Sequence, residues 1–286
     1  MTRRRARLSG KPSLRVERSL QREGFRLVAG MDEVGRGALA GPVSVGVVVV
    51  DETSRSGPVG LRDSKLLPPH RREQLVAPVR RWALAYGVGH ASAAEIDEIG
   101  IMGALRRAGR RALHATGVRP DVVLLDGNHD WLTDPAREGL LAFAETDTDA
   151  SGAGDAPLPV RTLIKGDMRC SSVAGASVLA KVERDAAMVA YATAHPVYGW
   201  AVNKGYAAPE HRSALLEHGP CALHRRSWNL LAAPAQEAQP PGTTSAMPDE
   251  APDVGVADMD EAAPAVSGPG SRVEWAMMSD VEVIRG

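Results

Sequence analysis

The chain has 286 residues with 44% apolar but only 4% aromatic side chains, so its core must be built mainly from Val, Leu, Ala and Ile. Only two cysteines occur, Cys170 and Cys221, which argues against a disulfide framework and against a cysteine-based zinc site. No apolar run approaches the ~20 residues of a membrane span, and the arginine-rich N-terminus lacks an apolar signal segment, so we expect a cytoplasmic protein.

Apolar runs bounded by Gly and Pro alternate with segments of helical periodicity, which predicts an α/β fold. The predicted strands are residues 27–31, 43–50, 85–91, 121–125 and 160–164. The predicted helices are residues 68–85, 92–117, 171–195, 209–218 and 224–231. The first of these helices begins at a Pro-Pro pair, and the helix at 171–195 ends before Pro196.

Charge is distributed unevenly between three predicted parts of the chain. Residues 1–24 form a basic N-terminal arm with a short helix, and residues 25–232 form the folded domain, which contains an acidic loop at 144–159. Residues 233–286 carry ten acids and two bases and few large apolar side chains, so we predict a disordered acidic tail. Residues 1–232 therefore have a net charge of +7, which suits a polyanionic partner but also serves solubility.

The most informative stretch is residues 27–50, LVAGMDEVGRGALAGPVSVGVVVV. Asp32 and Glu33 directly follow the first predicted strand, and a carboxylate pair at the end of a buried strand is costly unless something neutralises it. A hard divalent cation is the natural partner, because it prefers carboxylate oxygens. The alternative interpretation is an acidic turn in a βαβ unit, with glycines present only for the bend.

Gly35, Arg36 and Gly37 follow the acid pair after a single residue, Val34. They offer exposed backbone N–H groups and one planar cation, which suits a phosphodiester or the edge of a sugar. The segment is not a Walker A loop, because no Gly-Lys-Ser/Thr follows, and it lacks the spaced glycines of the dinucleotide fingerprint.

Three further acids stand out by their setting. Asp126 ends a predicted strand, Asp167 follows Gly166 after the next strand, and Asp185 lies on the long helix. Functional groups gather at strand ends in α/β sheets, although each acid taken singly also suits a turn or a cap. With Asp32 and Glu33, the strand-end acids Asp126 and Asp167 make four carboxylates at one edge of the sheet, and four such groups cannot all ionise unaided. Two divalent ions about 3.5–4 Å apart would resolve the repulsion and clamp a scissile phosphate.

Basic and aromatic residues accompany these acids. Lys165 and Lys181 flank the predicted cluster and either balance its charge, contact phosphate or lie solvated on the surface. Tyr206 follows Lys204 and Gly205, which suits stacking on a sugar or base as well as a place in the core. His211, His218 and His224 lack tight metal-ligand spacing, so we expect them to be structural or to be helix-end groups near a basic surface.

At these residues the chain resembles ribonuclease HII, the type 2 branch of the ribonuclease H superfamily. The matching segments occur in the family's order and cover roughly residues 27–230: VAGMDEVGRGALAGPV, LRDSKLL, VVLLDGN, IKGDMRCSSVAGASVLAKVERD, NKGYAAPEH and HGPCALHRRSW. The resemblance implies a ribonuclease H-like α/β fold, with a mixed five-stranded sheet flanked by helices and a C-terminal helical part. The acidic loop at 144–159 looks like an insertion, and the tail has no counterpart in the family core.

The resemblance also implies a function. It implies an endonuclease that hydrolyses the RNA strand of RNA–DNA hybrids and nicks duplex DNA 5′ of single embedded ribonucleotides, leaving 5′-phosphate and 3′-hydroxyl ends. The implied cofactor is a divalent metal, Mn²⁺ or Mg²⁺, and the implied partners are the hybrid and ribonucleotide-containing duplex DNA. We expect a monomer with no membrane partner, acting in ribonucleotide and primer RNA removal.

The resemblance assigns roles residue by residue. The catalytic, metal-binding acids are Asp32, Glu33, Asp126 and Asp167. The substrate-binding residues are Gly35, Arg36 and Gly37, which read the ribose 2′-OH, and Tyr206, which stacks on the sugar at the DNA side of the junction. The supporting residues are Lys65, Lys181 and Asp185.

Other functions compete with this one. A junction resolvase or integrase-like nuclease shares clustered acids but lacks the Gly-Arg-Gly and Lys-Gly-Tyr pair, and it would cut all-DNA duplexes. A non-catalytic hybrid-binding protein would be expected to lack at least one of the acids. A separate hypothesis gives the acidic tail a role in competing with nucleic acid for the basic face, in which case deleting residues 234–286 would tighten hybrid binding at low salt.

Overall fold

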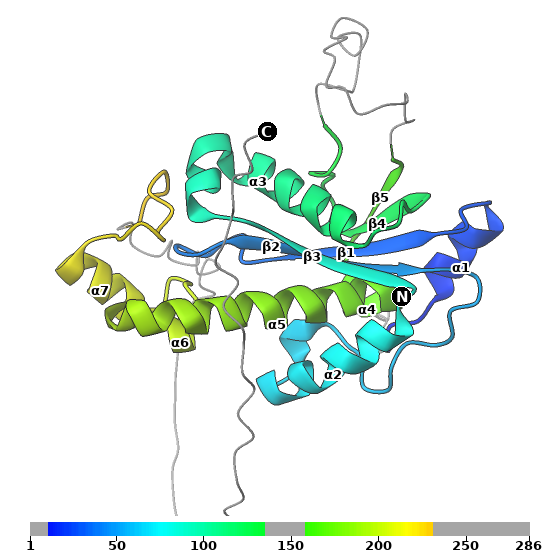
Figure 1. Ribbon diagram of the computed structural model, residues 1–286, viewed down its shortest axis with the longest axis horizontal. Coiled ribbons are helices and arrows are strands. Elements are labelled where there is room, and N and C mark those ends of the chain that lie inside the picture. Colours follow the sequence, from blue (N-terminus) through cyan, green and yellow to red (C-terminus); the bar gives the residue numbers. More distant parts are fainter. Residues whose placement is uncertain (1–10, 135–157, 231–286) are drawn as a thin grey trace, which may run out of the picture. The chain divides into compact units, whose positions relative to one another are not determined.

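Five strands form one mixed sheet, as expected, and their order is β3-β2-β1-β4-β5 (Figure 1). In this computed structural model, residues 11–134 and 158–230 are described, so the tail and most of the acidic loop lie outside them. β1 pairs antiparallel with β2 and parallel with β4, while β2–β3 is antiparallel and β4–β5 is parallel. The strands are β1 (Val28–Val34), β2 (Val43–Val50), β3 (Ala85–Ala91), β4 (Val122–Asp126) and β5 (Val160–Leu163).

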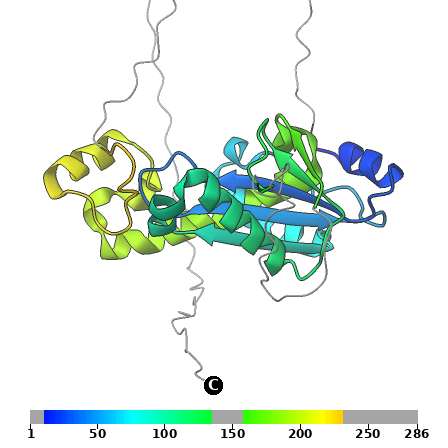
Figure 2. The ribbon, with the colours of Figure 1, turned by 90° about the horizontal axis from the view of Figure 1, so that it is seen from above.

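Helices cover both faces of the sheet (Figures 1 and 2). α3 lies on one face, and α5 with α2 lies on the other. The helices are α1 (Arg15–Arg22), α2 (Pro69–Trp82), α3 (Ala93–Ala115), α4 (Gly166–Arg169), α5 (Ser171–Ala194), α6 (Trp200–Asn203) and α7 (Pro209–His218), with 3₁₀ turns η1 (Ser64–Leu66) and η4 (Pro196–Tyr198). None of the helices in these ranges is long and apolar enough to cross a bilayer.

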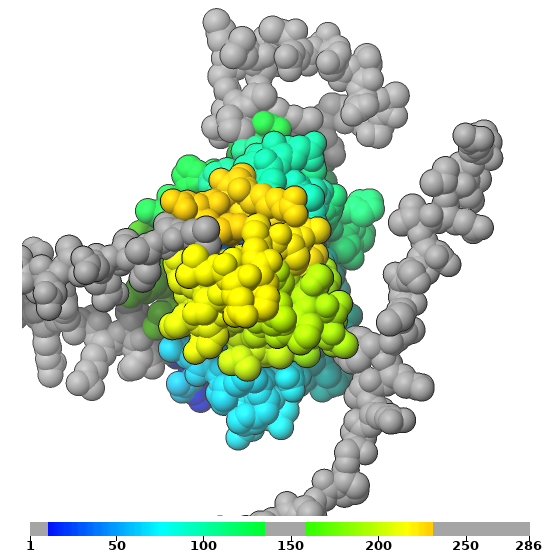
Figure 3. Space-filling view, turned by 90° about the vertical axis from the view of Figure 1, so that its left-hand side faces the viewer, coloured from blue at the N-terminus to red at the C-terminus, as the bar shows by residue number. Residues whose placement is uncertain are grey.

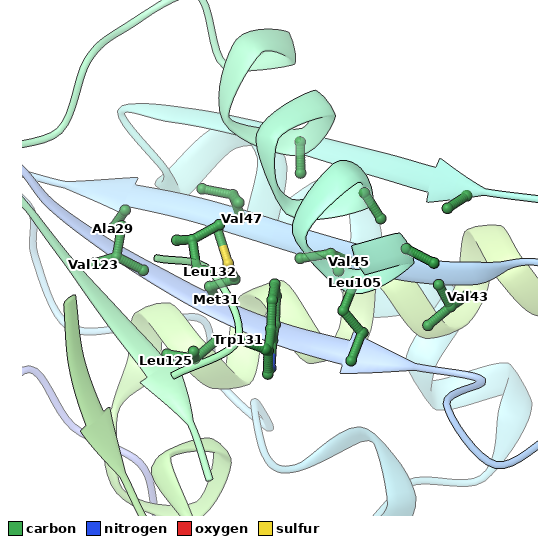
Figure 4. Close-up of a cluster of buried hydrophobic side chains, with 14 of the residues drawn as sticks. Ala29, Met31, Val43, Val45, Val47, Leu105, Val123, Leu125, Trp131 and Leu132 are labelled. Atoms are coloured by element: carbon green, nitrogen blue, oxygen red, sulfur yellow. The ribbon is translucent and has the colours of Figure 1, made fainter. Parts of the chain in front are cut away.

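Burial on both faces explains why the strands read as continuous apolar runs. Along β1, Met31 packs into the cluster under α3, whereas Val28 packs into the cluster against α5. Figure 4 shows the first cluster, in which Met31 and Val45 of the sheet lie near Leu105 and Trp131. Alternation of side chains along a strand sends each neighbour to the opposite cluster.

Glycines let α5 lie directly on the sheet. A Cβ on Gly30 would come within 2.4 Å of Ser172, and one on Gly46 within 2.2 Å of the Ala176 carbonyl oxygen. Both distances are shorter than real contacts, so only glycine permits this approach. The helix that carries much of the candidate site is thereby held at a fixed distance from β1.

A third cluster forms the C-terminal helical part. It joins Leu39 and Met188 to Tyr198, Trp200 and other apolar residues of α6, α7 and the segment that follows. Figure 3 shows α7 and that segment on the surface at this end of the described domain. The C-terminal helical part therefore packs on both the chain after β1 and the end of α5.

Several element bounds differ from the sequence-based predictions. β1 extends to Val34 instead of ending at residue 31, because residues 32–34 pair with residues 44–46 of β2. The helix predicted at 224–231 is wrong for its described residues, which form turns and a bridge around the anchored Arg225 side chain. The helix predicted at 92–117 breaks at Gly100, whose φ is +71°. The short helices α4 and α6 were missed, since a single turn carries no periodicity.

Candidate active site

Three carboxylates from separate elements converge at one edge of the sheet. Oxygens of Asp32 in β1, Asp126 at the end of β4 and Asp167 in α4 all lie within 4.8 Å of one another. Asp32 and Asp167 are buried, and Asp126 is half-buried. The parallel pairing of β1 with β4 brings the first two together, as strand-end carboxylates in α/β sheets often are.

Asp32 is the most deeply buried of the three, with 2% of its surface exposed. It pairs across the sheet with Gly46, whose missing side chain leaves room for α5, so its carboxylate lies on the α5 side. Burial raises the pKa of Asp32 well above its usual value; the Ser177 hydroxyl opposes this, and Asp126 adds to it. Its Oδ1 has no hydrogen-bond partner among the described residues.

The ends of β4 and β5 are tied together at the site. The Gly166 backbone N–H donates to Asp126 Oδ1 at 2.7 Å, which leaves the next residue, Asp167, beside Asp126. Burial raises the pKa of Asp167 to about 6, with repulsion from Asp126 and Asp63 as further causes. Lys165, which precedes this turn, is exposed and adopts a left-handed backbone with φ of +57°.

Glu33 lies outside the group of three acids. Because β1 continues through it, its side chain points away from that of Asp32, and Arg36 approaches it at 3.7 Å. Burial raises the pKa of Glu33, Arg36 lowers it, and repulsion from Asp126 raises it. The Glu33 carboxylate therefore still interacts electrostatically with the acidic cluster. Its role as a metal ligand therefore stays a prediction.

The η1 turn brings a lysine and a further acid to the cluster. Lys65 Nζ lies 3.9 Å from Asp167 Oδ2. Burial lowers the pKa of Lys65, but attraction to Asp32, Asp63 and other acids outweighs it, so the pKa is raised. Asp63 is buried and accepts a hydrogen bond from the Lys65 backbone N–H at 2.9 Å. The sequence pattern alone does not single out Asp63, although the LRDSKLL segment that contains it is part of the resemblance.

The acidic cluster fits a divalent cation. Carboxylate oxygens from three elements face one point, and the partnerless Oδ1 of Asp32 is a buried acceptor that a cation would satisfy. Without a cation, repulsion and burial both disfavour ionised Asp32 and Asp167. The donor set is all oxygen, which suits Mg²⁺ or Mn²⁺ rather than a soft metal.

The Gly-Arg-Gly loop (residues 35–37) leaves β1 just beyond the acids. Gly35 is buried with φ of +81°, whereas Arg36 and Gly37 are exposed. A Cβ on Gly35 would come within 2.0 Å of Arg184 Nε, so the loop rests directly on that side chain. Gly37 has no heavy atom within 4 Å of its Cβ position, so a ligand can approach it closely.

Tyr206 lies in a turn that pairs with the segment after this loop. Leu39 N–H donates to the Gly205 carbonyl at 2.8 Å, and the Arg184 guanidinium lies 5.4 Å from the Tyr206 ring centre. The His211 Nδ1–H donates to the Tyr206 carbonyl at 2.8 Å. The ring is partly exposed and therefore free on one side to stack on a ligand.

Lys181 and Asp185 form an ion pair on α5, with 2.6 Å between Nζ and Oδ1. Arg72 approaches the other Asp185 oxygen at 3.7 Å, so this acid is held by two cations and does not join the acidic cluster. Lys181 also lies 5.9 Å from the Tyr206 ring centre. Ser177, Lys181 and Arg184 occupy one face of α5, which therefore spans the site from Asp32 to the Tyr206 turn.

The mixed sheet with its acidic edge defines a nuclease of the ribonuclease H-like class. Among solved structures, ribonuclease H2 from Pyrococcus horikoshii OT3 has a TM-score of 0.53 and 27% identity, over 72% of this chain and 95% of that chain. Ribonuclease HII from Archaeoglobus fulgidus, solved in complex with PCNA, shares the fold with a TM-score of 0.55 and 24% identity, covering 72% and 95% of the two chains.

Sequence comparison narrows the class. The family model for ribonuclease HII matches residues 29–231. Ribonuclease HII of Streptomyces avermitilis is 46% identical over 223 residues, covering 78% of this chain and 85% of the relative. That of Moorella thermoacetica is 45% identical over 212 residues, covering 74% and 91%. The chain belongs to the ribonuclease HII family and is thus a ribonuclease H, a phosphodiester hydrolase.

Proposed function

We propose that this protein hydrolyses the RNA strand of RNA–DNA hybrids and nicks duplex DNA on the 5′ side of single embedded ribonucleotides. The observation that carries the proposal is the convergence of Asp32, Asp126 and Asp167 oxygens within 4.8 Å, beside an exposed Gly-Arg-Gly loop. The names of the similar ribonucleases HII support the substrate class.

The acids hold the reaction centre. Asp32, Asp126 and Asp167 would bind divalent cations, Mn²⁺ or Mg²⁺, with Glu33 completing the set from the rim. The chemistry that two cations held by these acids would supply is activation of water and stabilisation of the departing 3′ oxygen, which would give 5′-phosphate and 3′-hydroxyl ends. Lys65 balances the remaining negative charge at Asp167 and offers a cation to the phosphate.

The loop and the tyrosine supply substrate choice. The 2′-OH is the group that distinguishes RNA from DNA at a single site, and exposed backbone groups at Arg36 and Gly37 can reach it without a side chain in the way. Tyr206 stacks on the adjacent deoxyribose, with Arg184 and Lys181 near its ring. Lys181 and Asp185 support this face of α5 through their ion pair.

The cellular role follows from this substrate choice. We propose that the protein acts as a cytoplasmic monomer in the removal of misincorporated ribonucleotides and of primer RNA. Contacts of basic side chains with phosphates would hold the duplex without reading its sequence.

The first test is a nicking assay with Mg²⁺ or Mn²⁺ on a labelled duplex that contains one ribonucleotide, beside an all-DNA duplex. We expect one nick 5′ of the ribonucleotide and none in the control. Asp126→Asn should lower the rate by at least about 10³-fold, because it removes a metal-binding charge at the centre. Asp121→Asn, at the other end of the same strand, is the matched control and should cleave normally; Asp121 accepts a hydrogen bond from Leu27 N–H at 2.8 Å, which Asn can also accept.

Two outcomes would contradict the proposal. Equal cutting of the all-DNA duplex would favour a resolvase-like nuclease. Binding of the hybrid without cutting under either metal would favour a non-catalytic hybrid-binding protein.

A further inference from the structure

Two arginines are fully buried behind the Gly-Arg-Gly loop. Arg184 of α5 and Arg225 of the segment after α7 each have 0% of their surface exposed. Within residues 11–134 and 158–230, neither makes a salt bridge with a carboxylate; both guanidinium groups donate to backbone carbonyls. Burying a guanidinium charge without a carboxylate partner costs free energy, which the hydrogen bonds to backbone carbonyls partly offset. Such a costly arrangement suggests that the two arginines have a functional role.

Arg225 holds the Gly-Arg-Gly loop from its inner side. Its guanidinium donates to the Gly35 carbonyl at 2.6 Å, the Arg36 carbonyl at 2.8 Å and the Gly41 carbonyl at 3.2 Å. In a trans peptide the C=O of one residue and the N–H of the next point in opposite directions. The N–H groups of Arg36 and Gly37 therefore point away from Arg225, on the exposed side.

No described group accepts a hydrogen bond from either of these N–H groups. Two adjacent donors, the N–H groups of Arg36 and Gly37, are thus presented to solvent at the exposed part of the loop. The direction of these N–H groups is fixed by the inward-pointing carbonyls of the same peptide groups, and those carbonyls are held in place by their hydrogen bonds from Arg225.

Arg184 packs against Gly35 of this loop and ties the segment that follows the loop to the Tyr206 turn. It donates to the Pro42 carbonyl at 2.8 Å, the Ala40 carbonyl at 3.3 Å and the Lys204 carbonyl at 3.0 Å. Gly205 packs so closely here that a Cβ on it would lie 2.5 Å from the Ala40 carbonyl oxygen. This guanidinium therefore joins the segment after the loop to the turn that carries Tyr206, together with the backbone hydrogen bonds from Leu39 and Ala40 to the Gly205 carbonyl.

We propose that Arg225 and Arg184 are positioning residues for ribonucleotide recognition: they hold the Gly-Arg-Gly loop and the Tyr206 turn as one preorganised unit. The proposal rests on the proposed function, since it assigns the 2′-OH to this loop. Preorganised donors lose less entropy on binding, so the preference for a ribonucleotide depends on these buried groups.

Arginine is the residue suited to this task. Its planar guanidinium carries five N–H donors in a fixed fork, whereas the lysine ammonium offers three donors at one point. Arg225 also lies 4.9 Å from the Trp228 ring centre, which holds the plane of the fork. A lysine at residue 225 would keep the charge but could not hold the same carbonyls.

The test compares Arg225→Lys with Arg18→Lys. Arg18 also clamps backbone carbonyls, those of Asp51, Glu52 and Ser54, but it does so from α1, which contributes none of the candidate site residues. Nicking of the one-ribonucleotide duplex gives kcat and KM, and the all-DNA duplex as inhibitor gives Ki. The ratio Ki/KM measures the preference for the ribonucleotide and does not depend on the fraction of active enzyme.

We expect Arg225→Lys to lower Ki/KM about tenfold, equivalent to ~1.4 kcal/mol, mainly through KM, with Ki for all-DNA nearly unchanged. Arg18→Lys should leave the ratio at the wild-type value. A folded Arg225→Lys protein with the wild-type ratio would overturn the proposal, as would a fall only in kcat.

Two further arms separate the causes of failure. If Arg225→Lys does not fold, Trp228→Leu is the deciding variant, because it removes the ring beside the Arg225 guanidinium but keeps the guanidinium itself. We expect Trp228→Leu to lower Ki/KM by less than tenfold. An unchanged Ki/KM in this variant would overturn the proposal. If wild-type protein does not nick the one-ribonucleotide duplex at all, the proposed function fails. Wild-type nicking with an unchanged ratio in the variants is the failure specific to the arginines.

Discussion

The backbone N–H of Gly166 donates to Asp126 Oδ1 at 2.7 Å, although the two residues are 40 positions apart in the sequence. This bond joins the start of α4 to the end of β4 and leaves Asp167 facing Asp126. The acidic site is therefore built by strand pairing and by one charge-assisted hydrogen bond, not by a contiguous motif.

Metal binding should stabilise the folded protein measurably. Saturating Mn²⁺ or Mg²⁺, at about 100 times Kd, contributes ~2.7 kcal/mol, which raises Tm by roughly 5–10 °C in a domain of this size. Asp32→Asn should lose most of this shift, and without metal it should melt no lower than wild type because a buried carboxylate is removed. Differential scanning calorimetry measures both effects, with Asp121→Asn as the control. An equal metal shift in Asp32→Asn would contradict the assigned ligand.

Two glycines of one loop should respond differently to substitution. A Cβ on Gly37 would meet no atom within 4 Å, so the Tm of Gly37→Ala should match that of wild type. Its nicking rate should fall about tenfold or more, because the added methyl group would stand where the substrate approaches the loop. Gly35→Ala would place a Cβ 2.0 Å from Arg184 Nε at φ of +81°, so it should lower Tm as well as activity. Melting curves and nicking rates of both variants check this. A fully active Gly37→Ala would argue against close contact with the substrate.

Glu17 of α1 should stabilise the start of α5. Its Oε1 accepts from the Ser172 backbone N–H at 3.0 Å and from the Ser172 hydroxyl at 2.7 Å. Glu17→Ala should therefore destabilise the protein by ~1–2 kcal/mol, as the loss of a helix N-cap does. Urea unfolding measures the change, and Glu23→Ala, at an exposed position just after the same helix, is the control. A Glu17→Ala protein more stable than wild type would mean that burying the Glu17 carboxylate destabilises the fold by more than its hydrogen bonds stabilise it.

His224 should make stability depend on pH in the acid range. Its Nδ1 accepts from the Cys221 N–H at 3.0 Å, so Nε2 carries the proton and donates to His211 Nε2 at 3.1 Å. Burial lowers the pKa of His224 from 6.5 to about 4, with repulsion from His211 as the next cause. Between these values the unfolded chain binds more protons than the folded one, so stability is full above pH 6.5 and is lost as pH falls towards 4.

The shift corresponds to at most ~3 kcal/mol. Urea unfolding at a series of pH values from 7 to 4 measures the loss. His224→Gln should flatten the profile, although it lowers stability at pH 7, while His70→Gln at an exposed position should keep the wild-type slope. A wild-type slope in His224→Gln would assign the pH dependence to other groups.

The sequence by itself determined the sheet, the main helices and the family. Val43–Val50 is apolar apart from Ser44 and formed β2 with the predicted bounds, because a strand buried on both faces needs no partner information to be recognised. Asp32, Asp126 and the Gly-Arg-Gly loop were also found from their local setting, since Asp32 directly follows an apolar run, Asp126 ends one, and the loop comes just after the acid pair.

Only the tertiary structure decided which groups meet. Extension of β1 to Val34 turned Glu33 away from Asp32, and the η1 turn brought Asp63 and Lys65 to Asp167. The pairing of His211 with His224 and the burial of Arg184 and Arg225 could not be predicted, because a sequence does not show which distant groups a His or Arg side chain meets. Their partners are backbone carbonyls and rings from distant segments, and packing alone determines which of these lie within hydrogen-bond distance.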